Sequence, residues 1–399
     1  MTVSYWQKRK FAGTGSLRRP SASLKKWDIA VIGGGLVGVA AAYYLKLLGC
    51  DRVVVLEKKC VGYGASGRNA GFILAGLAEP YSRLIVAMGR DSAKEIMIST
   101  LDNHDLIESA VSDKAIECGY RRGGSYHLAI SEVERKELEE SVELLNADGF
   151  DVEYRSGVSR QAGRRLKKYP GGLFNPADGK IDPFAFVNGL SDGLDVFEGF
   201  EANRIIKCGG ALEIRSEKEK ISAEMAVVAV NGYAPLLDRY FDNLVFPVRG
   251  QMLATSPVPG NRLGESPYYA NFGYDYFRRT DDDAIIMGGL RNRFIDDELG
   301  YEDITNPALQ KALEDYIIEN LGIDEFSVDA RWGGVMGYTI DGLPLVGSLP
   351  HNSSVIAAVG YNGHGFGLGM IVARDLARAI MKNENSDLLK RFSLKRFSR

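Results

Sequence analysis

Apolar runs alternate with glycine-rich turns at the start of the chain, and this pattern predicts a strand–helix–strand unit. Trp27–Ile32 is almost entirely apolar, as expected for a parallel strand buried on both faces. Val39–Leu48 follows with a helical pattern, and Asp51–Leu56 is a second apolar strand that ends on Glu57. The segment GGGLVG at positions 33–38 joins the first strand to the helix.

This glycine-rich turn has the spacing of a dinucleotide-binding site. Gly33 permits a tight turn, Gly35 lets the backbone approach a pyrophosphate, and Gly38 lets helix and strand pack closely. The helix N-terminus offers free N–H groups and the positive end of its dipole to phosphates. Glu57 lies 19 residues beyond the last glycine, where it can accept hydrogen bonds from the ribose hydroxyls of an adenosine. NAD and FAD both fit this unit.

The rest of the chain is predicted to form further helices, further buried strands and an antiparallel sheet. Helical patterns occupy Ser131–Ala147, Phe184–Leu194 (with Asp182 as N-cap) and Met370–Met381. Buried strands are expected at Glu224–Val230 and Ser354–Val359. The first of these ends in Asn231-Gly232, which fits either a crossover back to the nucleotide site or an ordinary hairpin turn. An aromatic-rich antiparallel sheet is predicted from Val245–Ala254, Tyr274–Arg279 and Ala284–Gly289.

Composition sets broad limits on what the protein does. The 399 residues are enough for two or three domains, and the net charge of −3 implies no general attraction to nucleic acid or anionic lipid. The four cysteines are scattered without a CxxC pair, as in proteins of a reducing compartment, and a cytoplasmic location is expected. The sequence has no Cys/His cluster that would predict a metal site, and it has no GxSxG elbow that would predict a hydrolase.

The first 26 residues contain seven Lys or Arg and no acid, and they precede an uncharged apolar run at 29–45. This is the outline of a signal peptide or membrane anchor. The run is short for a membrane span, however, and contains four glycines. We therefore expect residues 1–26 to be a disordered or loosely docked basic arm.

Two further glycine-rich loops follow the first. GYGASGRNAGF at positions 62–72 comes soon after Glu57 and combines small residues with Arg68 and Asn69. GYNGHGFGLG at positions 360–369 leads into the last predicted helix, so it can serve a second anionic or electron-accepting group. A single pyrophosphate needs only one such loop, so the additional loops favour FAD over NAD.

Five ordered blocks make the chain resemble the D-amino-acid-oxidase-like FAD oxidoreductases, the group that includes glycine oxidase, sarcosine oxidase and gamma-glutamylputrescine oxidase. The blocks are the Gly33–Glu57 unit, GASGRNAG at 64–71, PVRGQ at 247–251, GYTIDGLPLVG at 337–347 and GYNGHG at 360–365. The similarity runs from Asp28 to about Met381. The SGRNAG block is most similar to the gamma-glutamylputrescine oxidase branch.

The resemblance implies an α/β fold of two interleaved domains. A Rossmann-like FAD-binding domain would take residues 27–85, 150–235 and 331–385. An antiparallel-sheet substrate domain would take residues 86–149 and 236–330, and residues 386–399 would form a C-terminal tail. The implied reaction is hydride transfer from the carbon of a C–N bond to flavin N5, followed by hydrolysis of the imine. O2 or another acceptor would reoxidise the flavin.

The glycine loops and the resemblance together predict a set of site residues. Catalytic or substrate-side candidates are His364, Tyr276 and Arg291, although a loop residue that bonds the backbone or the flavin is the favoured interpretation of His364, because hydride transfer needs no base. Cofactor contacts are expected from Gly33, Gly35, Leu36, Val37, Gly38, Glu57, Lys58, Gly64, Ala65, Ser66, Arg68, Asn69, Ala70, Gly71, Ile205, Ala229, Asn231, Gly232, Met336, Gly337, Gly363, His364, Gly365, Phe366 and Gly367. Arg68 and Asn69 are expected to donate hydrogen bonds to the flavin.

The chain departs from the family at three positions. Met336 occupies the region where glycine oxidase has an arginine for the substrate carboxylate, and Gly367 stands where sarcosine oxidase has a lysine. A free α-carboxylate loses these anchors unless Arg291 or Arg249 replaces them, so an amine without an α-carboxylate is favoured. No cysteine lies near Met336, so FAD is expected to be non-covalent. An apolar residue near Ile286 matches the oxygen-activating lysine of sarcosine oxidase, which leaves oxidase and dehydrogenase both open.

Two alternatives to an amine or amino-acid oxidoreductase remain. One is a non-catalytic FAD-fold or assembly protein, associated with a membrane through its basic arm. The other is an NAD-dependent dehydrogenase, against which the second and third glycine loops argue.

Overall fold

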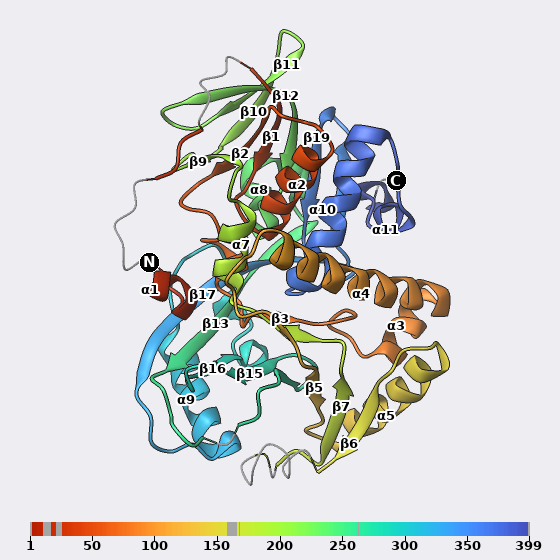
Figure 1. Ribbon diagram of the computed structural model, residues 1–399, viewed down its shortest axis with the longest axis vertical. Coiled ribbons are helices and arrows are strands. Elements are labelled where there is room, and N and C mark those ends of the chain that lie inside the picture. The colour runs from red at the N-terminus through yellow and green to blue at the C-terminus, as the bar shows by residue number, and fades with distance from the viewer. Residues whose placement is uncertain are drawn as a thin grey trace.

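Two large sheets organise the chain, one above the other in Figure 1. The computed structural model describes residues 2–10, 17–20, 26–157, 166, 168–261 and 263–397. The long helix α4 (Arg90–Asp113) runs across the middle of the molecule between the sheets. The two sheets, with their helices, are the two lobes of the protein.

The first sheet is built on parallel strands, as the apolar runs predict. Its path is β10-β11-β12-β1-β2-β9, and β19 joins β12 while β18 joins β19. The pairs β1–β2, β2–β9, β1–β12 and β12–β19 are parallel. The strands are β1 (Trp27–Ile32), β2 (Val53–Glu57), β9 (Asp195–Glu198), β10 (Arg204–Cys208), β11 (Ala211–Arg215), β12 (Lys220–Val228), β18 (Leu345–Leu349) and β19 (Asn352–Val359).

Both faces of this sheet are covered, which explains why its central strands β1 and β2 are largely apolar. Ile29 and Val31 of β1 face the helices α2 (Leu36–Leu47), α7 (Pro183–Leu190) and α10 (Gly365–Lys382). Ala30 and Ile32 face the opposite core. Gly369 lets α10 approach α2 closely, because a Cβ there would lie 2.8 Å from Leu36 Cδ2.

The second sheet has the order β17-β13-β16-β15-β14-β5-β7-β6, and its strands pair antiparallel except for β14 and β5. Helix α9 (Pro307–Leu321) packs on it, and α3 (Tyr81–Met88) and α5 (Glu132–Ala147) flank one end. The strands are β5 (Ser125–Leu128), β6 (Glu153–Ser156), β7 (Gly171–Asn175), β13 (Val245–Thr255), β14 (Tyr268–Ala270), β15 (Asp275–Arg279), β16 (Ile285–Gly289) and β17 (Val328–Thr339).

Short elements join and complete the lobes. A small sheet of β3 (Phe72–Ile73), β8 (Gly179–Lys180) and β4 (Arg121–Arg122) lies between the two large sheets. Helices α8 (Ala234–Leu237) and α11 (Asp387–Arg391) pack in the first lobe. The C-terminal segment is docked there too, since Phe392 is fully buried and its carbonyl accepts a hydrogen bond from Val346 N (2.8 Å).

Three strands that lie within the predicted FAD-binding domain belong to the second sheet of the structure. Strands β6 and β7 fall within residues 150–235, and most of β17 falls within 331–385, yet all three pair in the second sheet. Pairing partners far along the chain decide this membership. The helix expected at Phe184–Leu194 spans Pro183–Leu190 and is capped by Asp182, whose carboxylate accepts from Ala185 N (2.9 Å).

The N-terminal segment contradicts the expected loose arm. Residues 5–10 form helix α1, and Tyr5 and Trp6 are each only 4% exposed. Their rings pack with Met252, Ile286 and Trp332. Two bulky aromatic side chains supply enough apolar surface to hold this short basic segment against the protein. Residues 11–16 and 21–25 of the arm lie outside the described residues.

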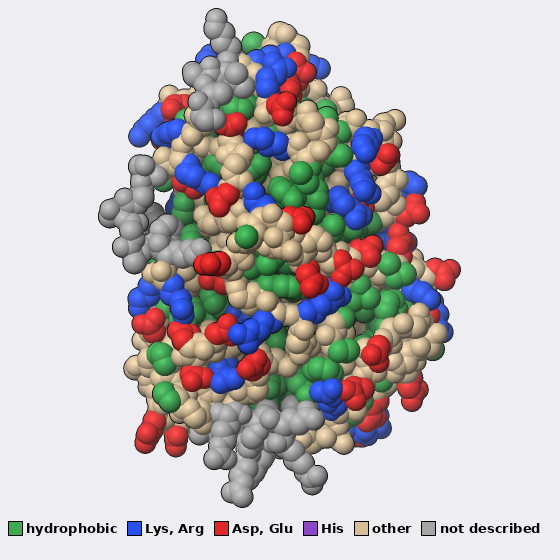
Figure 2. Space-filling model, in the orientation of Figure 1, with side chains coloured by type: hydrophobic (Ala, Val, Ile, Leu, Met, Phe, Trp, Pro, Cys, Tyr) green, Lys and Arg blue, Asp and Glu red, His purple; other side chains and the backbone are tan. Residues whose placement is uncertain are grey.

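The apolar run at 29–45 is not an anchor, because it forms β1, the glycine turn and most of α2. Among the described segments, no helix has the length and apolar content needed to cross a bilayer. Basic and acidic side chains are intermixed over the face seen in Figure 2.

Candidate active site

A cavity of about 590 Å³ lies where the two lobes meet. The first lobe contributes the start of α2, the second glycine loop (Gly62–Phe72) and the third glycine loop (Gly360–Gly369). The second lobe contributes tyrosines of β14 and β15 and the strand β17. The cavity therefore combines backbone-rich loops on one side with aromatic side chains on the other.

The first glycine loop is shaped so that only glycine fits. Gly33 has a φ of +112°, and a Cβ on it would lie 2.6 Å from the Ala229 carbonyl oxygen. A Cβ on Gly38 would lie 2.0 Å from the Gly33 carbonyl oxygen, so helix and strand are in contact there. Gly35 is the N-cap of α2 and offers no capping side chain of its own, and the helix N-terminus borders the cavity, with Ser66 Oγ accepting from Leu36 N.

Glu57 lies at the end of β2, beside this loop. Its carboxylate accepts hydrogen bonds from Gly34 N (2.7 Å) and Lys59 N (2.8 Å). Burial raises the pKa of Glu57 above its usual value, although these two N–H groups act in the opposite direction. The neighbouring Lys58 points elsewhere and pairs with Glu201 (2.5 Å). Glu57 thus has the expected position, whereas the Lys58 side chain is engaged at the surface.

Asn69 organises the second glycine loop from within. Its side-chain amide donates to the carbonyls of Ala65 (3.0 Å) and Ser66 (2.9 Å), and its oxygen accepts from Gly71 N (2.7 Å). Ser66 Oγ accepts a hydrogen bond from Leu36 N (2.8 Å), which ties the second loop to the first. The Asn69 donors are therefore used to set the loop conformation, contrary to the expectation that they face a ligand.

Arg68 also departs from expectation. Its guanidinium donates to Tyr63 O (2.8 Å), to Gly333 O (2.7 Å) and to Asp303 (2.8 Å), and the side chain is 4% exposed. Two further bonds go to Thr2. These acceptors consume its donors, so Arg68 holds the loop in place and does not present its charge to the cavity.

The third glycine loop is held by two asparagines. Asn231 Oδ1 accepts from Gly360 N (3.0 Å) and Tyr361 N (3.2 Å), and Asn362 Oδ1 accepts from Thr339 N (2.8 Å). Helix α10 begins at Gly365 without a side-chain cap. The N-termini of α2 and α10 both border the cavity, and their dipoles favour negative charge in it.

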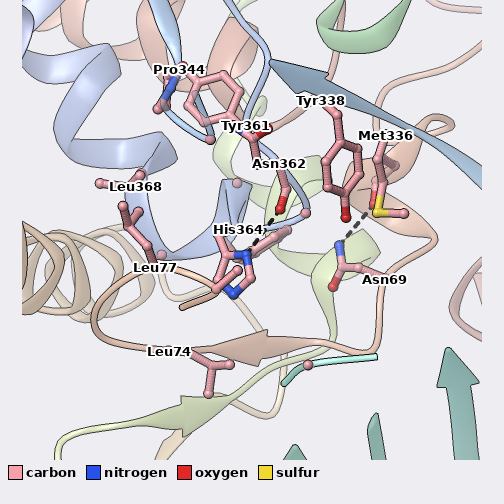
Figure 3. Close-up of a pocket in the computed structure, with 18 of the residues that line it drawn as sticks. Asn69, Leu74, Leu77, Met336, Tyr338, Pro344, Tyr361, Asn362, His364 and Leu368 are labelled. Carbon is pink, nitrogen blue, oxygen red and sulfur yellow. Dashed lines mark hydrogen bonds between the residues drawn. The ribbon is translucent and has the colours of Figure 1, made fainter. Parts of the chain in front are cut away.

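His364 lies at the start of α10, and its hydrogen bonds indicate the position of its proton. Nδ1 is 3.2 Å from the Asn362 carbonyl oxygen, which can only accept, so Nδ1 carries the hydrogen. Nε2 is then an acceptor, 3.4 Å from the hydroxyl of Tyr269. Burial lowers the pKa of His364 and favours the neutral ring. In Figure 3, His364, Tyr338 and Asn69 surround the same space.

Tyrosines form the opposite wall. Tyr269, Tyr274, Tyr276 and Tyr338 all line the cavity. Burial raises the pKa of Tyr276 to about 12 and raises the pKa values of Tyr269 and Tyr338 as well, so their hydroxyls stay protonated. The ring of Tyr276 packs edge-on against Phe72 at 6.3 Å.

Arg291 contributes a basic side chain to this wall of the cavity. Its guanidinium carbon lies 4.7 Å from the Tyr274 ring centre and 5.1 Å from that of Tyr338. No carboxylate of the described residues lies within 4.0 Å of the Arg291 guanidinium. Arg249, the other candidate, is buried and paired with Glu298 (2.9 Å). Arg291 is therefore available to an anion in the cavity and Arg249 is not.

The structure brings most of the predicted residues to the cavity. Those that line it are Gly35, Leu36, Val37, Ala65, Ser66, Arg68, Asn69, Ala70, Ala229, Asn231, Tyr276, Arg291, Met336, Gly363, His364, Gly365, Phe366 and Gly367. Gly33, Gly38, Gly64, Gly71, Gly232 and Gly337 lie behind this lining in the loops and strands that shape it. Ile205 belongs to β10, an edge strand separated from β1 by β11 and β12, and it is not part of this lining.

Several lining residues escaped the sequence analysis. The residues that line the cavity but are not predicted from the sequence include Leu74, Leu77, Tyr269, Tyr338 and Asn362. The block GYTIDGLPLVG contains Tyr338, so the motif itself was a signal for this residue. Nothing local to Leu74 and Leu77 marked them, because their role depends on contact between the lobes.

The glycine turn, the acid at the end of β2 and the two open helix N-termini define a dinucleotide-binding protein. The profile of the DAO family, described as FAD dependent oxidoreductase, matches residues 28–379. The chain belongs to this family, and FAD is its cofactor. The residues present fit FAD, because Gly35 and Gly38 leave a bare backbone at the α2 N-terminus and the cavity continues to α10.

Similar proteins support the same class. The chain is 27% identical to gamma-glutamylputrescine oxidoreductase of Escherichia coli, over 88% of this chain and 83% of that protein. It is 25% identical to a probable oxidoreductase, OrdL, of Haemophilus influenzae, over 92% and 85%. Its fold is similar to that of glycine oxidase from Geobacillus kaustophilus, with a TM-score of 0.78 and 20% identity over 94% of this chain and 100% of that chain.

Asp303→Asn tests the structural role assigned to Arg68. Hydrogen bonds from Arg68, Thr2 and Tyr63 outweigh the effect of burial and hold the pKa of Asp303 below its usual range. The stabilisation that the ionised Asp303 carboxylate gives to the folded protein is therefore complete above about pH 4. It declines as pH falls towards the pKa of Asp303 in the folded state. We expect the variant to lose about 3 kcal/mol of unfolding free energy at pH 7.

The control is Asp329→Asn, which removes a more exposed partner of Lys8 and is expected to cost less than about 1 kcal/mol. Urea unfolding of both variants between pH 3 and 8 measures these differences. Equal losses for the two variants, or a loss for Asp303→Asn that does not shrink below pH 4, would contradict the assignment.

Proposed function

We propose that this protein oxidises the C–N bond of a small amine or amino acid that carries a carboxylate. The observation that supports the carboxylate is Arg291, whose guanidinium lies on the cavity wall without an acidic partner among the described residues. Arginine binds carboxylates through two parallel hydrogen bonds. This revises the expectation of an amine without an α-carboxylate, which rested on the positions of Met336 and Gly367 alone.

The substrate class is consistent with the relatives, whose names are those of enzymes acting on gamma-glutamylputrescine and glycine. Bound FAD supplies a hydride acceptor for the carbon next to the substrate nitrogen, and water then hydrolyses the imine. The four cysteines, all in described segments, lie outside the cavity lining, so we propose that FAD is held without a covalent bond to them.

The side chains around the cavity suit the deprotonation of an ammonium group. His364 is neutral, and its Nε2 lone pair can accept a proton from the substrate nitrogen. The protonated hydroxyls of Tyr269 and Tyr338 cannot take that proton, but they can donate hydrogen bonds. Leu74, Leu77 and Phe72 line the same space with apolar side chains.

Anaerobic titration of the purified holoenzyme with matched pairs of amines tests the proposal. Each pair consists of an amino acid and the same amine without its carboxylate, such as proline and pyrrolidine. We expect one or more acids, and not their partners, to bleach the visible flavin absorbance. In Arg291→Met, the concentration for half-maximal bleaching should rise about 100-fold, because the carboxylate loses its charged partner.

Arg291→Lys is the conservative control and should recover part of this loss. Bleaching by uncharged amines with equal efficiency would contradict the carboxylate, and no bleaching with any amine would favour the non-catalytic alternative. Repeating the reaction in air separates an oxidase from a dehydrogenase.

His364→Asn tests the proton acceptor. The asparagine amide can still donate to the Asn362 carbonyl, but it offers no basic nitrogen. We expect flavin reduction by saturating substrate to slow about 100-fold. In the wild type, this rate should fall as pH decreases through the lowered pKa of His364, because the protonated ring cannot accept a proton.

Stopped-flow absorbance at several pH values measures this dependence, and the variant should lack the acidic decline. His351→Asn is the matched control, since that exposed histidine bonds Asp238 outside the cavity lining. An unchanged rate and pH profile in His364→Asn would assign His364 to a loop-shaping role.

A further inference from the structure

The first residues of the chain lie against the back of the second glycine loop. Ser4 Oγ donates to Gly67 O (2.7 Å), and Trp6 Nε1 donates to Asn69 O (2.8 Å). Gln7 Nε2 donates to Tyr63 O (3.0 Å). These bonds occupy backbone carbonyls on the side of the loop that faces the N-terminal segment, while Ala65, Ser66 and Ala70 of the same loop line the cavity.

We propose that residues 2–9 form a strap that holds the second glycine loop in its FAD-binding conformation, so that the bonds from the strap determine how long FAD stays bound. The loop has little structure of its own. Its regular part is the single turn Ala65–Gly67, and the rest of the loop is held by the side chains of Asn69, Arg68 and Ser66 and by the strap. A loop that is ordered before the ligand arrives does not spend binding energy on its own ordering.

The strap is built for this contact. Ser4 and Gln7 are fully buried polar side chains, and each bonds the other as well as the loop. Short basic segments rarely bury polar side chains unless these find specific partners. Arg68 adds two bonds in the opposite direction, to the carbonyl (2.7 Å) and hydroxyl (3.0 Å) of Thr2. The loop and the strap are thus joined at both ends and in the middle.

The strap is anchored on the other lobe. Tyr5 donates to Asp282 (2.6 Å), Arg9 pairs with the same carboxylate (2.6 Å), and Lys8 pairs with Asp329 (2.5 Å). The Trp6 ring also covers Arg278, which lies 4.8 Å from it and donates to Gly71 O (3.2 Å) at the end of the loop. The strap therefore connects the second sheet to the FAD-binding loop of the first lobe.

The sheets do not depend on the strap. Among the described strands, none in either large sheet pairs with residues 2–10. Its aromatic rings contribute to one small cluster only, with Ala70, Met252 and Trp332 among its members. Removing the hydrogen bonds while keeping an aromatic ring at position 6 should leave the fold intact and release the loop.

The test compares two sets of substitutions within the strap. Ser4→Ala, Trp6→Phe and Gln7→Met together remove the three bonds that side chains of the strap donate to the loop, and leave the two bonds between Arg68 and Thr2 in place. Lys8→Ala with Arg9→Ala removes ion pairs to Asp329 and Asp282 and leaves the loop bonds in place. The readout is the rate of FAD release from diluted holoenzyme, followed by the rise of flavin fluorescence, with far-UV circular dichroism recorded alongside.

We expect FAD release to be about 30- to 100-fold faster in the triple variant, from three hydrogen bonds each worth a factor of about 3 to 5. Release from the Lys8/Arg9 variant should stay within about twofold of the wild type, and circular dichroism should not change. A release rate that is unchanged in the triple variant, or equally fast in both variants, would overturn the proposal.

If the triple variant does not fold, Ser4→Ala alone decides the matter. It should release FAD about 3- to 5-fold faster with unchanged far-UV circular dichroism, and unchanged release would overturn the proposal. This readout requires no substrate. It is therefore independent of whether the proposed carboxylate-bearing amine is correct.

Discussion

A buried guanidinium must be paired, and Arg68 meets this requirement by drawing together four segments that are distant in sequence. Its partners are Tyr63 in its own loop, Thr2 at the N-terminus, Asp303 before α9 and Gly333 on β17. Unpaired, this charge would cost several kcal/mol, so the four segments are held together around it. The second glycine loop, and with it one wall of the cavity, owes its position to this contact.

The two sides of the cavity use different chemistry because they come from different lobes. Glycine loops and helix N-termini of the first lobe present backbone N–H groups, which suit a phosphate-bearing dinucleotide. The second lobe presents tyrosines and Arg291, which suit a small substrate with an anionic group. The helix dipoles of the first lobe and the Arg291 guanidinium of the second lobe both favour anions in the cavity. The cavity therefore suits both the cofactor and the carboxylate-bearing substrate that we propose.

Local patterns in the sequence were enough to predict the parts of the fold that depend on neighbouring residues. The first glycine loop with Glu57, the central parallel strands and the Asp182 cap all follow from spacing within a few tens of residues. Long-range contacts were not accessible. Asp303 is 235 residues from Arg68, so the sequence could not show that the arginine donors were already taken. The basic composition of residues 1–26 predicted a loose arm. The aromatic pair Tyr5-Trp6 within the same segment was the feature that indicated packing against the protein.

The central claim is that FAD lies between the second and third glycine loops with the substrate on the Arg291 side. A crystal structure with FAD and a small carboxylic acid that lacks the amine tests it most directly. The account predicts the carboxylate on the Arg291 guanidinium, the flavin ring against Asn69–Gly71 and residues 363–367, and Arg68 still paired with Asp303. A carboxylate bound away from Arg291, or an Arg68 side chain released from Asp303 to contact the flavin, would contradict it.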